Sequence, residues 1–146
     1  MSLASNVEMI SPMVDQLMAF ISRFRVNDGT EVDIELAAHE ALANAIVHGN
    51  LMDTSKRVFV TCRCESDGEV DLTVQDQGEG FDPDRVANPT ASENRLRVSG
   101  RGIHLMKNFM DEVCFENGGS VVRMRKKGQR QLKQRMGIRA VWSLLF

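Results

Sequence analysis

The sequence predicts an α+β fold, a two-layer sandwich in which helices cover one face of a sheet and water covers the other. Two observations lead to this fold class. Apolar residues recur at helical spacing in residues 11–24 and 30–49, and they alternate with polar residues in residues 57–64 and 69–76. Helices and strands are therefore grouped along the chain, which is typical of sheets with one wet face.

Both early helices carry recognisable start signals. Ser11 offers a capping hydroxyl directly before Pro12, which suits a first helical turn. Thr30, followed by Asp33, resembles a capping box and predicts the start of the second helix. This second helix is expected to end near Gly49.

Two hairpins and a long loop account for the rest. Asp67-Gly68 predicts a tight hairpin between the first two strands, and residues 112–127 form a second hairpin that turns at residues 117–119. Residues 77–102 are rich in glycine, proline and polar residues and too long for a turn, so they predict a functional loop. A short helix is expected to open at Gly102.

Length and composition fit one intracellular globular domain. The chain has 146 residues, of which 42% are hydrophobic and 26% charged, enough to bury a core. No apolar run approaches the roughly 20 residues that span a bilayer, and the N-terminus lacks signal-peptide features. Cys62, Cys64 and Cys114 have neither disulfide-framework nor zinc-site spacing, so we expect free thiols and a cytoplasmic protein.

The net charge of −2 conceals an asymmetry. Residues 1–116 hold 10 Lys/Arg against 20 Asp/Glu, a net −10, whereas residues 117–146 hold eight basic residues and no acidic one. A basic segment can attract nucleic acid or acidic partners. Because no binding face of interleaved aromatic residues accompanies it, we expect a solvated charge run and no direct nucleic-acid binding.

Three short segments carry polar residues or glycines that invite a chemical explanation. Glu40, Asn44 and His48 lie four residues apart, which places them along one face of the second helix. Asp76 ends a strand and is followed by Gly78 and Gly80, which let the backbone approach a ligand. Taken singly, the helical stripe favours a solvated helix face over a site.

The third segment is the approach to the last helix. Gly100 and Gly102 lead into it, and free N–H groups at a helix start can hold phosphate. A glycine before a helix is also often only a hinge, so this signal is moderately specific by itself.

In order, "EALANAIVHGN", "VQDQGEGFDP" and "SGRGIHLMKNFMDEV" resemble the N box and the two glycine boxes of one ATPase superfamily. Its members include DNA gyrase, a heat-shock chaperone, histidine kinases and mismatch-repair ATPases. The chain is particularly similar to the bacterial anti-sigma-factor serine kinases, over residues 10–127. The resemblance implies the Bergerat fold, a two-layer α/β sandwich with a mixed sheet, helices on one face, and an ATP lid over residues 81–98.

The same resemblance implies a role for each matching residue. Asn44 would hold the Mg²⁺ that bridges the ATP phosphates, Glu40 would be the general base, and Asp76 would accept the adenine amino group. Ser120 replaces the threonine usual near adenine and keeps its hydroxyl. The residues implied to surround adenine are Gly78 and Gly80, and those implied to surround the phosphates are Ser99, Gly100, Arg101 and Gly102.

This assignment explains the helical stripe in physical terms. A magnesium ion bound mainly by phosphate oxygens and water needs only one neutral protein oxygen, which Asn44 can supply. A carboxylate one turn away, Glu40, can then reach a hydroxyl that is aligned with the terminal phosphate.

The function implied is that of an ATP-dependent serine/threonine protein kinase and anti-sigma factor. It would phosphorylate a small anti-sigma-factor antagonist, sequester a sigma factor and form a homodimer, without membrane contact. An alternative is a nucleotide-gated regulator that binds partners without kinase activity. A sensor histidine kinase is disfavoured, because the chain has no separate helical phosphoacceptor domain and carries Glu40 where that class usually has asparagine.

Two departures from the family pattern stand out. The strand that normally precedes the first helix must be short or absent, since only ten residues are available. The kinase domain is expected to end at Lys127, yet residues 128–146 continue as a basic and apolar tail. We expect the tail to form a short helix that packs on the domain, joins a dimer contact or touches a membrane. Its apolar residues are Ile138, Val141, Trp142, Leu145 and Phe146.

Overall fold

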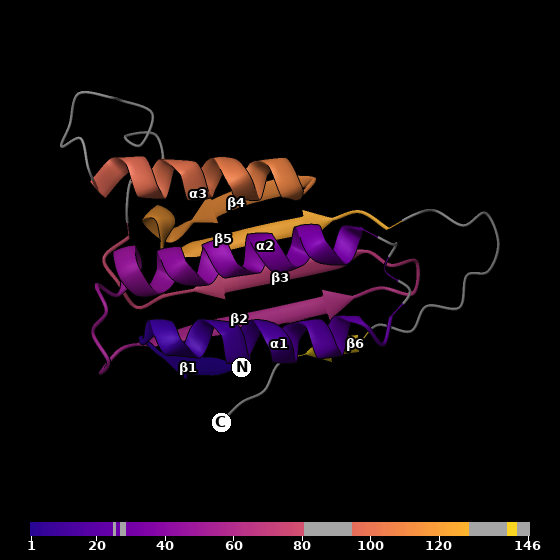
Figure 1. The fold of residues 1–146 in the computed structure, drawn as a ribbon, viewed down its shortest axis with the longest axis horizontal. Helices are drawn as coiled ribbons and strands as arrows, with labels where there is room; N and C mark the ends of the chain where they lie inside the picture. The colour runs from indigo at the N-terminus through magenta and orange to yellow at the C-terminus, as the bar shows by residue number, and fades with distance from the viewer. Residues whose placement is uncertain (25, 27–28, 81–94, 129–139, 143–146) are drawn as a thin grey trace.

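A computed structural model describes residues 1–24, 26, 29–80, 95–128 and 140–142, with the backbone alone for residues 95–100 and 140–142. Helices α1 (Ile10–Ile21), α2 (Thr30–Ala43) and α3 (Arg95–Phe109) lie side by side on one face of a sheet (Figure 1). The predicted α+β two-layer sandwich is therefore confirmed. Within the described ranges, no helix has the length and apolar character needed to span a bilayer.

The sheet has the strand order β1-β2-β3-β5-β4, and β6 pairs with the outer edge of β2. Every pairing among the described strands is antiparallel, so the expected mixed sheet is wrong. β3 and β4, which α3 connects in the chain, run parallel to each other. They do not pair, because β5 lies between them and is antiparallel to both. The strand bounds are β1 (Ser2–Ala4), β2 (Arg57–Cys64), β3 (Val70–Gln75), β4 (Glu112–Glu116), β5 (Val121–Lys126) and β6 (Ala140–Trp142).

Both hairpins form where the sequence predicts them. Gly68 turns the chain between β2 and β3 with a φ of 85°, a backbone conformation that glycine adopts without strain. A single 3₁₀ turn, η4 (Asn117–Gly119), joins β4 to β5. Gly118 and Gly119 also have positive φ there. The predicted alternation is confirmed by β2, whose even-numbered residues are buried.

The core lies between the helices and the sheet. Leu17, Ile34 and Leu72 contribute fully buried side chains from α1, α2 and β3. Cys62 and Cys64 also face this core as free thiols, with their sulfur atoms 4.0 Å apart. The expectation of unpaired cysteines is thus confirmed for all three thiols.

The two predicted helix caps are wrong. A 3₁₀ turn, η1 (Val7–Met9), precedes α1 and is capped by the Asn6 side chain, which accepts the Glu8 N–H at 3.0 Å. Ser11 is consequently already inside the helix. Gly29, with a φ of 87°, occupies the cap position of α2 and makes Thr30 the first helical residue.

A half-buried lysine fastens the helices to the sheet at the end where α2 begins. Lys126 of β5 donates from Nζ to Asp33 Oδ2 at 2.7 Å and to the carbonyl of Phe109 at 2.5 Å. Since Asp33 lies in the first turn of α2 and Phe109 ends α3, one ammonium group joins β5 to both helices. Asp33 therefore acts in an ion pair instead of in a capping box.

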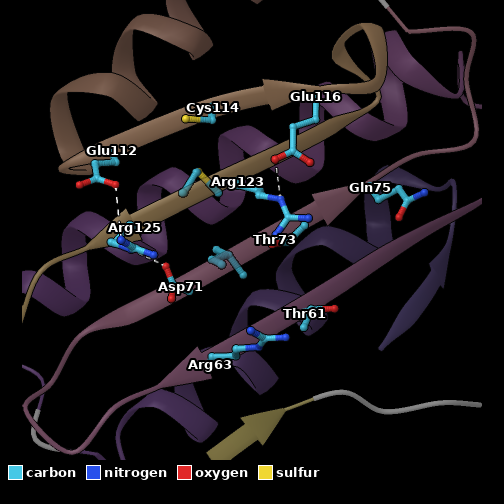
Figure 2. Close-up of a pocket in the computed structure, with 12 residues that line it drawn as sticks. Thr61, Arg63, Asp71, Thr73, Gln75, Glu112, Cys114, Glu116, Arg123 and Arg125 are labelled. Atoms are coloured by element: carbon cyan, nitrogen blue, oxygen red, sulfur yellow. Dashed lines mark hydrogen bonds and ion pairs between the residues drawn. The ribbon is translucent and has the colours of Figure 1, made fainter. Parts of the chain in front are cut away.

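The face of the sheet without helices is polar, as expected. Arg63, Asp71, Arg125 and Glu112 pair across β2, β3, β5 and β4, so charges alternate in sign across four strands. Arg125 Nε lies 2.8 Å from Asp71, and its Nη1 lies 3.7 Å from Glu112 (Figure 2). A shallow groove of about 480 Å³ runs over this face.

The outer edge of β2 is covered by both ends of the chain. β1 pairs with Arg57–Phe59 and is short, as the sequence predicts. β6 pairs with Cys62–Cys64. The predicted tail helix is wrong at residues 140–142, because the unpaired backbone of the β2 edge offers hydrogen bonds that a strand satisfies. Ile138, Leu145 and Phe146 lie outside the described residues.

The proposed boundary between residues 1–127 and 128–146 generates a first prediction. Deletion after Lys127 removes β6 and exposes the β2 edge, so we expect a lower melting temperature and more aggregation, measured by light scattering. Nucleotide affinity should stay within about twofold of the parent, because β6 pairs at the end of β2 remote from the candidate site. A folded truncated chain that no longer binds nucleotide in a calorimetric titration would contradict this boundary.

Candidate functional site

Several predicted site residues meet at the end of the sheet where α2 finishes. This end of the sheet lies at the left in Figure 1. Asn44 directly after α2, Asp76 after β3 and Ser120 before β5 line one small cavity between the helices and the sheet. The cavity holds about 10 Å³, close to the space of one water molecule. Its other lining residues are mostly apolar, namely Ala41, Ala45, Val74, Met106, Phe115, Gly119 and Val122.

Asp76 is fixed in place by its own backbone and is almost fully buried, at 7% exposure. Its N–H donates to the Ser120 carbonyl at 2.9 Å, and its Oδ1 accepts the Gly78 N–H at 2.8 Å. Burial raises the pKa of the Asp76 carboxyl, although the bond from Gly78 and the charge of Lys56 oppose that rise. A buried carboxylate held this way can accept a hydrogen bond from a ligand.

Glycines let three segments meet around this carboxylate. A Cβ on Gly49 would overlap the Asp76 carboxylate, and one on Gly78 would overlap the Gly49 carbonyl. Gly80 has a φ of 82° and packs against the carbonyl of Gly118 in the η4 turn. The expected role of Gly78 and Gly80 in shaping this pocket is therefore consistent with the close backbone contacts seen here.

Glu40 and Asn44 lie together under α3. The Asn44 N–H bonds to the Glu40 carbonyl, so the two side chains stand one helical turn apart. A Cβ on Gly102 would lie 2.7 Å from Glu40 Oε2 and 3.3 Å from Asn44 Nδ2. Asn44 Nδ2 is buried without a hydrogen-bond partner among the described residues. Such a donor costs about 1–3 kcal/mol when unsatisfied, which a ligand oxygen would recover.

The helix widens directly after these residues. Asn44–Gly49 form a π-helical turn, η2, and such turns often occur at functional sites. The four-residue spacing that aligns Glu40 with Asn44 no longer places His48 directly above them, because a π-turn has more residues than an α-turn. His48 is half-buried and is not part of the cavity lining.

The expected start of the last helix at Gly102 is wrong. α3 begins at Arg95, so Ser99, Gly100, Arg101 and Gly102 all lie inside it. The segment continues as helix because Gly102 lets α3 approach Glu40 and Asn44 closely, a packing role that offsets the low helix propensity of glycine. Arg101 is exposed. Of the expected lid, residues 81–94 lie outside the described residues, and residues 95–98 are helical.

The sequence analysis missed two residues of this region, Gly49 and Asn50. Both were interpreted only as the end of a helix. Gly49 touches Asp76, and Asn50 is fully buried with three side-chain hydrogen bonds. Both residues end the segment "EALANAIVHGN" that resembles the N box, and beyond that resemblance their signal is an amide directly after a glycine at a helix end, which is common at ordinary helix ends.

The larger groove on the opposite face is a separate feature. Figure 2 shows that its charged residues come from the strands, and none of the predicted site residues lines it. Across the part of the chain that the structure describes, no cluster of three or more His, Cys, Asp or Glu side chains could hold a metal.

Comparison with known proteins identifies the family. A model of the histidine kinase-like ATPase domain matches residues 3–126. The chain belongs to the histidine kinase-like ATPase family. This membership confirms the resemblance seen in the three sequence segments, and it implies that the domain binds ATP.

Within this ATPase family, the chain is similar to several anti-sigma F factors. The chain is 34% identical to the anti-sigma F factor of Geobacillus thermodenitrificans, over 86% of the chain and 79% of the relative. It is 35% identical to that of Geobacillus stearothermophilus, over 74% and 77%. It is 37% identical to that of Clostridium perfringens, over 75% and 81%. These relatives are similar along most of both chains.

The residues present fit the two groups that the ATPase family implies. Asp76 offers a desolvated acceptor beside a cavity, which suits an adenine amino group. Asn44 has an unsatisfied buried Nδ2 donor next to the Glu40 carboxylate, which suits a phosphate oxygen. Its Oδ1 is the atom that would hold an Mg²⁺ ion bound mainly by phosphates. We therefore interpret this region as a site that would hold adenine at Asp76 and Mg²⁺ at Asn44.

Asp76→Asn should have different effects on the stability of the fold and on the affinity for ATP. Because burial raises the pKa of the Asp76 carboxyl, its ionisation disfavours the folded state, so stability falls as pH rises from the unfolded towards the folded pKa. At pH 7 Asp76→Asn removes that penalty, and we expect it to unfold no more easily than the parent. Below the unfolded pKa this advantage should vanish.

The same variant should bind ATP about ten- to hundredfold more weakly, a loss of about 1–3 kcal/mol, because its amide presents a donor to the adenine amino group. Thermal melts across pH and calorimetric ATP titrations measure both effects. Unchanged affinity in the folded variant would rule out Asp76 as the adenine ligand.

Gly102→Ala tests the contact between α3 and the polar stripe. The added methyl group would meet the free end of the Glu40 side chain, which can move, so the fold should survive. Alanine also gains up to about 1 kcal/mol of helix propensity. We therefore expect an equal or higher melting temperature together with weaker Mg²⁺-dependent ATP binding. A variant that binds Mg²⁺-ATP like the parent would show that this contact is not used.

Proposed function

We propose that the chain is an ATP-dependent serine/threonine protein kinase that acts as an anti-sigma factor. It would phosphorylate a small antagonist protein and sequester a sigma factor. The observation that carries the proposal is the juxtaposition of Glu40 and Asn44 beneath Gly102, next to the cavity that holds Asp76. The names of its relatives, which are anti-sigma F factors, support the regulatory part.

The proposed reaction uses three side chains in separate tasks. Asp76 accepts the adenine amino group and sets the position of the nucleotide. Asn44, whose buried amide has no protein partner within the described residues, contacts the phosphate region. Asn44 would hold Mg²⁺ there, and the ion would supply charge compensation for the phosphates. Ser120 contributes its carbonyl to the Asp76 N–H, while its hydroxyl donates to the Asn117 carbonyl at 3.1 Å.

Glu40 is proposed to complete the chemistry. A serine hydroxyl oxygen of the antagonist forms a bond to the terminal phosphorus, and the bond from that phosphorus to the bridging oxygen of ADP breaks. The hydroxyl proton passes to the Glu40 carboxylate. A carboxylate beside a triphosphate is repulsive for binding alone, so its presence favours transfer over mere nucleotide sensing.

The proposed kinase activity also accounts for the two proposed partners. A sigma factor and its antagonist would compete for a protein whose nucleotide state changes on phosphorylation, and the expected homodimer is part of this proposal. We expect it to act in the cytoplasm, where sigma factors meet RNA polymerase.

Glu40→Gln tests the kinase assignment. The substitution keeps shape and hydrogen bonding but cannot accept the proton, so we expect a rate reduced by about 10²–10⁴-fold with ATP binding retained. The measurement is transfer of labelled phosphate from ATP to a serine of the antagonist, identified among proteins that co-purify with the chain. Asn44→Ala is the comparison variant and should impair Mg²⁺-dependent binding and transfer together.

The outcomes distinguish two activities. Transfer at the parental rate by Glu40→Gln would overturn the role of Glu40. If the parent binds ATP and its partners but transfers no phosphate, the chain is a nucleotide-gated regulator without kinase activity.

A further inference from the structure

We propose that Asn50 is the positioning residue that fixes the adenine-reading carboxylate of Asp76, and so determines base specificity. This inference rests on the proposed adenine contact of Asp76. Asn50 itself lies beneath the turn that follows β3 and is completely buried, at 0% exposure. It acts on the site only through that turn.

The side chain of Asn50 holds three segments together. Its Oδ1 accepts the N–H of Gln77 at 2.8 Å. Its Nδ2 donates to the carbonyl of Arg57 at 2.9 Å and to the hydroxyl of Ser5 at 2.6 Å. The turn after β3, the start of β2 and the end of β1 therefore meet at one amide.

Only an amide satisfies this set of partners. Gln77 presents a donor and needs an oxygen, whereas the Arg57 carbonyl is an acceptor and needs an N–H group. The two partners also fix which amide atom is oxygen, since the reversed orientation would lose both bonds. Aspartate would keep the acceptor and lose the donors, and serine has no planar group that presents both.

The backbone around Asn50 is held firmly despite its strain. Leu51 and Met52 follow with φ values of 56° and 57°, a left-handed conformation that is costly for two consecutive side chains. The Asn50 N–H bonds to the Ala45 carbonyl at 2.8 Å, and the Met52 N–H bonds to that of Ile46 at 2.8 Å. The η2 turn thus imposes the position of the Asn50 side chain.

The bond to Gln77 acts on the carboxylate through the turn that carries it. Gln77 lies between Asp76 and Gly78, whose N–H is bound by Asp76 Oδ1. The Gln77 side chain adds a second link to β2 by accepting the Arg57 N–H at 2.7 Å. With the Gln77 N–H held by Asn50, the Asp76–Gly78 turn cannot rotate without losing a buried hydrogen bond, so the second carboxylate oxygen keeps its direction.

Inosine triphosphate provides the decisive probe. Its base carries a carbonyl oxygen where adenine has the amino group, and an N–H where adenine N1 is an acceptor, so the donor that Asp76 is proposed to accept is lost from its position, while the sugar and phosphates are unchanged. The parent should bind ATP about ten- to hundredfold more tightly than inosine triphosphate. Asn50→Ala should reduce this ratio towards one, with little change in affinity for inosine triphosphate, whereas Asp76→Asn should reduce it at least as far, because its amide can donate to the inosine carbonyl.

Three comparisons separate positioning from plain destabilisation. Ser5→Ala removes one bond of Asn50 and leaves the Gln77 bond, so it should lower the melting temperature and keep the ratio. Asn50→Asp keeps an acceptor for Gln77 and should retain more of the ratio than Asn50→Ala, which also provides a test if the alanine variant does not fold. In the Asp76→Asn background, Asn50→Ala should cause no further loss of ATP affinity.

A parental ratio in folded Asn50→Ala would overturn the inference, as would equal weakening of both nucleotides. If Asp76→Asn leaves the ratio unchanged, the proposed adenine contact fails and the role of Asn50 fails with it. A changed ratio in Asp76→Asn with an unchanged ratio in Asn50→Ala overturns the positioning role alone.

Discussion

The contact of Gly49 and Gly78 with Asp76 is the constraint around which the site is built. A carboxylate must be desolvated to recognise a base strongly, yet desolvation disfavours its charged form. In this structure the backbone serves both needs. Gly49 and Gly78, which have no side chains, pack closely against the carboxylate, and the Gly78 N–H stabilises its charge. The end of α2 and the end of β3 must therefore touch, and the widened η2 turn follows from that requirement.

The two ends of the helix layer are held in different ways. Where α2 begins, Lys126 joins Asp33 and the last carbonyl of α3 to the sheet through a half-buried ion pair. Where α2 finishes, α3 rests on Glu40 and Asn44 through Gly102, and a buried amide there has no partner in the described structure. One end is thus secured by protein contacts alone, while the other has polar groups that a ligand would satisfy.

The fold and the site were predictable to different degrees. The hairpins at Asp67-Gly68 and at residues 117–119 follow from local turn chemistry, so the sequence predicts them well. Errors arose where distant contacts overrule local signals. Gly102 resembles a helix start but is an internal packing position, and residues 140–142 have a helical apolar pattern but pair with an open strand edge.

The site residues show the same division. Asp76, Asn44 and Ser120 were recognisable because their segments match a family pattern, and they do line one cavity. Asn50 was not, because its partners Ser5, Arg57 and Gln77 are scattered along the chain and only the folded structure brings them to one amide.

The shared edge of β2 has a consequence for how the protein is made. Met1 pairs with Val60, and Trp142 pairs with Cys62. Two nearby residues of β2 therefore pair with residues that are far apart in the sequence. During synthesis β1 is available to cover β2 as soon as β2 emerges, whereas residues 140–142 leave the ribosome after every other described strand. The backbone of Cys62–Cys64 therefore stays an unpaired strand edge in the nascent chain until β6 is synthesised.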